Sequence, residues 1–99
     1  KKLVFSNLEI NISNYTVQYN GEYLDFPPKE FELLHYLAEH PNQVFTREQL
    51  LDRIWGYEYI GDTRTVVVHI KRIREKLNKQ EENWSIKTVW GVGYKFEVK

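Results

Sequence analysis

The 99-residue sequence lacks cysteine and methionine altogether, and it has no excess of either charge, with 14 basic and 14 acidic residues. The absence of cysteine excludes a disulfide framework, a thiolate metal site and a cysteine nucleophile, and it fits a reducing cytoplasm. No apolar run is long enough to cross a bilayer, and no signal-peptide pattern opens the chain. Because methionine is missing even at position 1, we expect the chain to be a fragment or a processed product that another segment precedes.

Hydrophobic residues make up 41% of the chain and aromatic residues 15%, which predicts a single globular domain over residues 1–99. The charge is unevenly distributed along it. Residues 1–61 carry five basic and nine acidic residues, residues 62–79 carry six and two, and residues 80–99 carry three of each. Phosphate responds to the local field rather than to the net charge, so residues 62–79 are the candidate segment for contact with nucleic acid.

Residues 1–26 alternate apolar and polar side chains over short stretches, which predicts an antiparallel sheet. Its strands are expected at residues 3–5, 8–12, 15–19 and 23–26. Asn20-Gly21 is a strong type I′ hairpin signal, and Ser13-Asn14 marks another turn. A sheet with one apolar face is more consistent with a packing platform than with a binding surface.

Three helices are predicted after this sheet, at residues 28 to about 40, 46–55 and 62–79. Pro28 suits the first position of a helix, and the preceding Pro27 offers no side-chain cap. Thr46 and Gln49 have the spacing of a capping box for the second helix. Asp62 or Thr63 is expected to cap the third helix.

The third predicted helix has an apolar face and a basic face. The apolar face consists of Val66, Ile70, Ile73 and Leu77. The opposite face consists of Arg64, Val68, Lys71, Arg72 and Glu75. A cationic helix held against a domain by an apolar stripe is typical of a helix that enters the major groove, although a cluster of charges can also be a solvated face.

Two β-prone runs, Trp84–Trp90 and Tyr94–Val98, follow the basic helix and predict a terminal hairpin over residues 84–98. Val44-Phe45 is expected to form a brief additional strand. The order of sheet (1–26), three helices (28–79) and hairpin predicts an α+β winged helix-turn-helix fold, in which the hairpin is the wing.

Three stretches of the sequence strongly resemble the effector domain of OmpR/PhoB-type response regulators. They are PPKEFELLHYLAEHPNQVFTREQLLDRIWG, GDTRTVVVHIKRIREKL and TVWGVGYKFE. The resemblance implies a cytoplasmic bacterial transcription factor that binds direct-repeat double-stranded DNA as a head-to-tail dimer and contacts RNA polymerase. It also implies a receiver domain, absent from this chain, through which a sensor kinase phosphorylates the protein.

The resemblance also implies the roles of individual residues. Positions that match DNA contacts of the family are Trp55, Arg64, His69, Lys71, Arg72, Arg74, Thr88 and Trp90. Arg72 is predicted to read a guanine edge, while Arg64 and Lys71 are predicted to hold phosphates. Val68 lies off the packing stripe and is predicted to contact a thymine methyl group. The loop of Tyr57, Glu58 and Tyr59 matches the segment that contacts RNA polymerase.

Three positions depart from the family pattern: Val67 where an aspartate is usual, Trp90 where relatives have an arginine, and Pro27 where a Ser/Thr cap is usual. Trp90 cannot supply an arginine's charge to the minor groove, so it packs against either the sugar-phosphate backbone or the domain itself. Trp55 either donates its N–H to phosphate or packs in the core with that N–H satisfied.

Other classes of function are less consistent with the sequence. It has no nucleophile–base pair, no phosphate-binding glycine loop and no spacing of histidines and acids typical of a metal site, which argues against an enzyme and predicts no cofactor. The alternative that remains is a winged-helix module for protein–protein contact, for which the zero net charge is the best argument.

Overall fold

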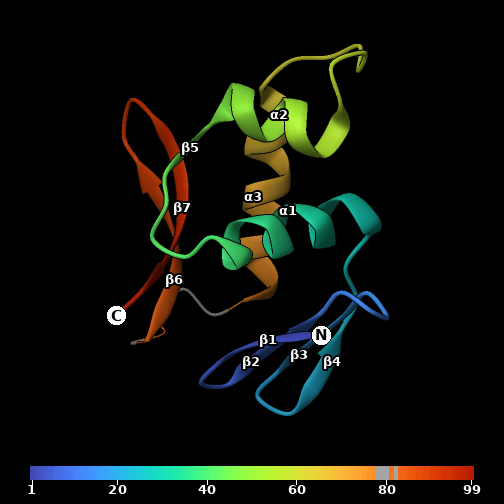
Figure 1. Cartoon of the computed structure of the whole chain (residues 1–99), viewed down its shortest axis with the longest axis vertical. Helices are drawn as coiled ribbons and strands as arrows, with labels where there is room; N and C mark the ends of the chain where they lie inside the picture. Colours follow the sequence, from blue (N-terminus) through green and yellow to red (C-terminus); the bar gives the residue numbers. More distant parts are fainter. Residues whose placement is uncertain (78–80, 82) are drawn as a thin grey trace.

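The structure, a computed structural model, describes residues 1–77, 81 and 83–99 and consists of two antiparallel sheets and three helices (Figure 1). In chain order the elements are β1 (Lys2–Phe5), β2 (Leu8–Asn11), β3 (Thr16–Tyr19), β4 (Glu22–Leu24), α1 (Pro28–Glu39), β5 (Phe45–Thr46), α2 (Arg47–Trp55), α3 (Arg64–Lys76), β6 (Trp84–Val89) and β7 (Gly93–Val98). The predicted α+β winged helix-turn-helix fold is confirmed.

The N-terminal sheet is a meander of four strands in the order β1-β2-β3-β4. Its inner face buries Leu8, Ile10 and Val17, as the alternation in the sequence predicts. Asn20 and Gly21 have positive φ angles of 53° and 81°, which the predicted type I′ turn requires. Strand β3 begins at Thr16, one residue after its predicted start, because Tyr15 lies in the preceding turn with a φ of 55°.

Helices α1 and α2 begin and end near the predicted positions. Pro28 is the first residue of α1, and Pro27 makes no capping hydrogen bond through its side chain. In α2 the Thr46 hydroxyl accepts from the Gln49 amide at 3.0 Å, and the Gln49 side chain accepts from the Thr46 amide at 2.8 Å. The capping box therefore forms, and Gly56 closes the helix with a φ of 94°.

Helix α3 is shorter than the predicted segment 62–79. It begins at Arg64, whose amide donates to the Asp62 carboxylate at 2.9 Å, whereas Thr63 makes no side-chain cap. A carboxylate two residues earlier thus satisfies a free amide of the first turn. The helix ends before Leu77, which is extended, and the last predicted positions, 78 and 79, lie outside the described residues.

The wing is part of a three-stranded sheet in the order β5-β7-β6. The predicted brief strand is Phe45–Thr46 rather than Val44-Phe45, and it pairs with Tyr94 and Gly93 of β7. A Cβ atom on Gly93 would lie 1.9 Å from the Phe45 carbonyl oxygen, so this close approach requires glycine. Strand β6 ends at Val89, one residue before the predicted end at Trp90.

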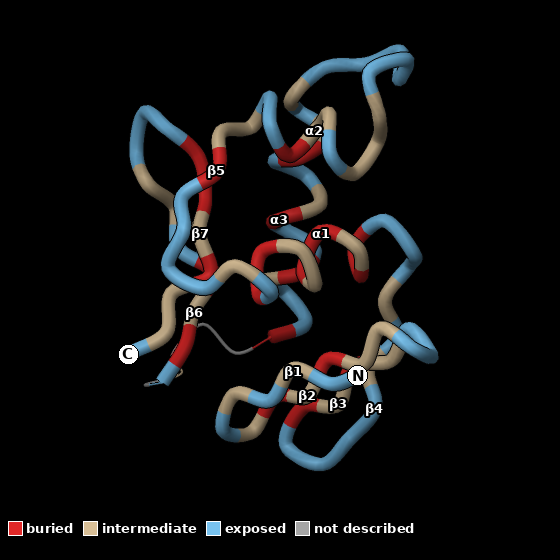
Figure 2. The backbone as a smooth tube through the Cα atoms, viewed as in Figure 1, coloured by how far each residue is buried: buried red, intermediate tan, exposed pale blue. Residues whose placement is uncertain are grey.

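A single hydrophobic cluster joins the two sheets and the helices (Figure 2). Helix α3 contributes Val66, Ile70 and Ile73, each with 1% or less of its surface exposed. Its apolar stripe therefore fixes which face of α3 points away from the body of the domain. Among the described residues, no helix is long and apolar enough to span a membrane.

Candidate nucleic-acid interface

The face of α3 opposite the core carries the cations that the sequence predicted there. Lys71 and Arg72 are exposed, and neither makes a hydrogen bond or ion pair with any described residue. One helical turn before these cations, Val67 and Val68 expose 43% and 41% of their surface, so both are accessible to a partner. Two cations without a partner among the described residues, beside exposed valines, match the needs of a surface that binds phosphate and thymine methyl groups.

At the start of this face, Arg64 is paired with Asp62. The guanidinium donates through Nε at 3.1 Å and through Nη2 at 2.7 Å to the Asp62 carboxylate. These side-chain bonds, together with the bond from the backbone amide of Arg64, hold the pKa of Asp62 below its usual value, and the hydrogen bonds and charge of Asp62 raise the pKa of Arg64. The side chain of Arg64 is still 87% exposed, so its remaining donors are accessible.

His69 and Trp55 lie side by side at the edge of this face. The His69 Nδ1 donates to the Thr65 carbonyl oxygen at 2.8 Å, which leaves Nε2 as the outer nitrogen. The His69 ring packs edge-on against the Trp55 indole, with 4.8 Å between the ring centroids. The Trp55 N–H has no partner among the described residues, and no buried side-chain nitrogen or oxygen there lacks one. The indole N–H therefore reaches solvent, while the Trp55 ring packs against the hydrophobic core.

Arg74 and Thr88, both predicted DNA contacts, are hydrogen-bonded to each other. Arg74 Nη2 donates to the Thr88 hydroxyl at 2.9 Å and to the Ile86 carbonyl oxygen at 2.8 Å, and Nε donates to the same carbonyl at 3.1 Å. Burial lowers the pKa of the Arg74 guanidinium, which the nearby Tyr94 partly opposes. The group nevertheless stays charged at neutral pH.

The wing tip presents an aromatic side chain to solvent. Trp90 is 89% exposed, so the alternative in which it packs against its own domain is wrong. The turn beneath it uses Gly91 at a φ of 80°. The wing cations Lys87 and Lys95 both lie near Glu97, at 3.8 Å and 3.6 Å, which offsets part of their charge.

The loop between α2 and α3 protrudes at the end of the molecule opposite the N-terminal sheet (Figure 1). Tyr57 is 88% exposed and Glu58 is also exposed, whereas the Tyr59 hydroxyl lies 3.2 Å from the Thr65 hydroxyl. Ile60 of the same loop is 97% exposed, although the sequence did not predict it as a contact residue. The signal that could have indicated it is an isoleucine beside a glycine, outside any periodic pattern.

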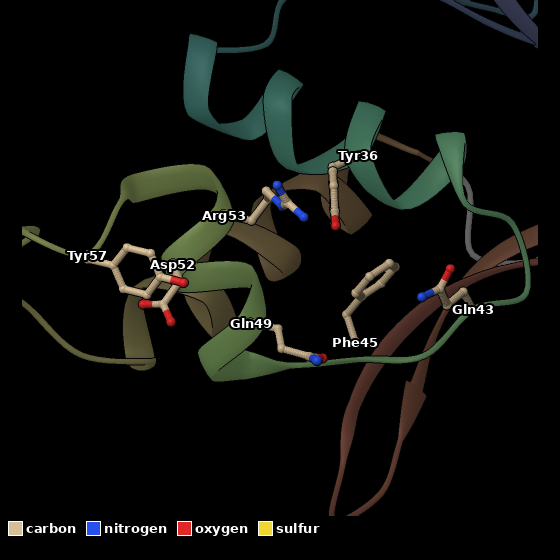
Figure 3. A pocket seen from close by; sticks show the side chains of 7 residues that line it. All are labelled: Tyr36, Gln43, Phe45, Gln49, Asp52, Arg53 and Tyr57. Atoms are coloured by element: carbon tan, nitrogen blue, oxygen red, sulfur yellow. The ribbon is translucent and has the colours of Figure 1, made fainter.

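A separate hollow of about 550 Å³ lies between α1, α2 and the segment before α2 (Figure 3). Its lining residues are Tyr36, Gln43, Phe45, Gln49, Asp52, Arg53 and Tyr57. The Arg53 guanidinium lies over the Tyr36 ring, 5.4 Å from its centroid. In the described part of the chain, no three His, Asp or Glu side chains are grouped so that they could hold a metal ion.

Comparison with known proteins shows which family model and which relatives this chain matches. Residues 21–96 match the family model described as "Transcriptional regulatory protein, C terminal". The transcriptional regulatory protein SrrA of Staphylococcus aureus is 55% identical over 97 residues, which cover 96% of this chain and 40% of SrrA. The chain thus spans about two fifths of the length of these curated relatives.

Two solved structures are also similar. The response regulator DrrB of Thermotoga maritima, an OmpR/PhoB homologue, superposes with a TM-score of 0.85 at 39% identity, over 97% of this chain and 44% of DrrB. The RstA DNA-binding domain of Klebsiella pneumoniae, in complex with the RstA box, superposes with a TM-score of 0.83 at 37% identity. That match covers 98% of this chain and 97% of the RstA domain.

Proposed function

Because this chain belongs to the transcriptional regulatory protein C-terminal family and is a DNA-binding effector domain of the OmpR/PhoB type, we propose that α3 enters the major groove of double-stranded DNA. The wing then lies on the adjacent backbone or minor groove. The observation that carries this proposal is the exposed face of α3, where Lys71 and Arg72 have no partner among the described residues. The similarity to the RstA domain, whose structure is a complex with the RstA box, supports it.

The residues of this face differ in chemistry and therefore in role. Arg72 has a planar fork of donors that matches O6 and N7 of guanine, so it reads a base edge. Lys71 is a compact point charge that binds phosphate, and Arg64 does the same with the donors that Asp62 leaves accessible. Val68 contacts a thymine methyl group.

The flanking residues extend this footprint along the backbone. The Trp55 N–H donates to a phosphate on one side of the groove, and His69, whose ring packs against the Trp55 indole, contacts the backbone beside it. Trp90 at the wing tip packs against the sugar-phosphate backbone, since it does not pack against its own domain. Thr88 belongs to the same wing and lies between Trp90 and the body of the domain.

For the whole protein, the family relationship supports further proposals. A phosphorylatable receiver domain precedes this chain, a sensor kinase acts on it, and the effector domains bind direct repeats as a head-to-tail dimer in the cytoplasm. The loop of Tyr57, Glu58 and Tyr59 contacts RNA polymerase, and its exposed position supports this. The family is one of transcriptional regulators, so we propose a binding role rather than a catalytic one for the domain.

Selection of bound duplexes from a random pool tests this function. We expect enrichment of a direct repeat, and affinity for it that falls steeply with salt because several phosphates are neutralised. A domain that enriches no duplex, or that binds one without salt dependence, would support the alternative of a protein–protein interaction module. The alternative is favoured only by the zero net charge.

A further inference from the structure

Arg74 is the described α3 side chain that hydrogen-bonds to the wing. We propose that it is a positioning residue that fixes the wing relative to the recognition helix, so that both elements meet the duplex in one arrangement. This inference rests on the proposed function, in which α3 and the wing bind DNA together. It assigns Arg74 a role different from that of a phosphate contact, which the family resemblance implies.

The geometry of the guanidinium supports a positioning role. Two nitrogens, Nε and Nη2, converge on the Ile86 carbonyl oxygen at 3.1 Å and 2.8 Å, and Nη2 also donates to Thr88 at 2.9 Å. Strand β6 is an edge strand of its sheet, so half of its backbone groups have no strand partner. Arg74 supplies charge-assisted donors to one of these carbonyls, and such bonds are stronger than neutral ones.

The position of these hydrogen bonds along β6 determines which part of the wing they fix. Ile86, with 9% exposure, belongs to the core, while Thr88 is half-buried and Trp90 is 89% exposed. The burial of the wing thus decreases toward the tip, and Arg74 hydrogen-bonds to β6 at the point where the contacts of that strand with the core end. The Arg74 guanidinium carbon also lies 5.7 Å from the centroid of the Tyr94 ring on β7, so Arg74 contacts both strands of the wing.

If Arg74 were chiefly a phosphate contact, it would have to bind through Nη1, the one guanidinium nitrogen that makes none of these hydrogen bonds to described residues. Nε and Nη2 are already engaged by protein acceptors, and the side chain is half-buried, unlike those of Lys71 and Arg72. Arg74 instead has the constraints of a structural bridge between two elements.

The test uses Arg74→Lys, which keeps the positive charge but lacks the planar fork. In the free domain we expect residual dipolar couplings of amides in β6 and β7 to fit one alignment tensor with those of α3. In the variant, amides near the wing tip should depart from that tensor while those of β1–β4 do not change. Arg53→Lys is the matched control, because Arg53 is an exposed arginine of α2 that lies over the Tyr36 ring of α1; this variant should leave all couplings unchanged.

Binding to the selected duplex gives the second measurement. We expect Arg74→Lys to weaken binding about tenfold without a change in salt slope, because the charge is kept. A phosphate contact predicts instead that lysine substitutes well, and that Arg74→Gln lowers the salt slope by about one ion, as expected for Lys71→Gln. Unchanged couplings together with near-normal binding by Arg74→Lys would overturn the positioning role.

Non-additivity gives an independent readout. If Arg74 holds the tip in place, Trp90→Ala should weaken binding less in the Arg74→Lys background than in the wild type, whereas independent contacts would add. Thr88→Val, which removes one acceptor of Arg74, should show the same coupling to Trp90→Ala even if Arg74→Lys folds poorly. Additive effects in both backgrounds would count against the proposal, whereas a wild-type domain that binds no duplex would refute the proposed function instead.

Discussion

Lys71 and Arg72 are neighbours on α3, both exposed and both without a partner in the described part of the chain. Their charges are equal, yet their hydrogen-bonding geometry differs. The arginine fork can satisfy two acceptors of one guanine, while the ammonium group binds any nearby phosphate. At the scale of single residues, sequence preference and general affinity are therefore separable in adjacent side chains.

The first prediction is that Arg72→Ala weakens binding to the selected duplex by about 1–3 kcal/mol and flattens the preference at one base pair. The reason is the loss of a bidentate contact to a base edge. Titrations against a series of single-base substitutions measure both effects. Lys71→Ala is the matched control: it should weaken all sequences alike and make the salt slope shallower by about one ion. Preference that is unchanged in Arg72→Ala would refute its assignment.

The second prediction concerns Asp62, whose pKa is lowered chiefly by the side-chain bonds from Arg64. A carboxyl group with a lowered folded pKa stabilises the fold above its unfolded pKa, and this contribution disappears as pH falls through the folded value. A carbon-detected NMR titration should therefore place the Asp62 midpoint below that of an ordinary aspartate. In Arg64→Gln the midpoint should rise. Equal midpoints in the two proteins would show that the pair does not form in solution.

Helix α3 also has an attachment on its C-terminal side. Lys76 donates to the Glu30 carboxylate at 2.8 Å, and its ammonium lies 4.6 Å from the centroid of the Phe26 ring. Glu30 is the one charged residue that is buried among the described residues, with 3% of its surface exposed. The recognition helix is thus linked to the first turn of α1 and to the segment that joins β4 to α1. Although α1 lacks a side-chain cap at Pro27, its first turn is held by this ion pair.

At this scale we predict that Lys76→Met lowers the free energy of unfolding by roughly 2–3 kcal/mol, because it leaves a buried carboxylate without its cation. The exposure of a third of the Lys76 side chain, 33%, keeps the expected loss below that of a fully buried pair. Urea unfolding measures the change. Lys71→Met, on the same helix without a described partner, should be nearly neutral. A Lys76→Met domain as stable as the wild type would mean that Glu30 is adequately solvated without Lys76.

Much of the architecture follows from local patterns, and the exceptions are tertiary. Val66, Ile70 and Ile73 form a stripe that predicts both the helix and its buried face, and both are confirmed. Helix α3 begins two residues after the start of the predicted segment, and Asp62, one of the two residues predicted to cap it, accepts from the Arg64 amide. The bonds between Arg74 and β6 could not be predicted, since they depend on how two elements distant in sequence pack together.

For the molecule as a whole, equal numbers of acids and bases conceal a separation of charge. The excess of acids lies before residue 62, and the excess of bases lies on and around α3. A domain with this distribution has little net attraction to a polyanion yet presents one attractive face. The domain is therefore attracted to a polyanion mainly when its basic face points toward it, and it binds less in other orientations. This suits a protein that discriminates among sites.

The pairing of β5 with β7 also has a consequence for the order in which the chain folds. Phe45 pairs with Tyr94, so this contact closes a loop of nearly half the chain, whereas the strands β1 to β4 pair with their immediate neighbours. Long-range closure is slower because more chain entropy is lost before contacts form. In pulse-labelling hydrogen exchange during refolding, we expect amides of the N-terminal sheet to gain protection before those of β5 and β7. The domain would then acquire its scaffold first, and the surface that meets DNA would be completed last.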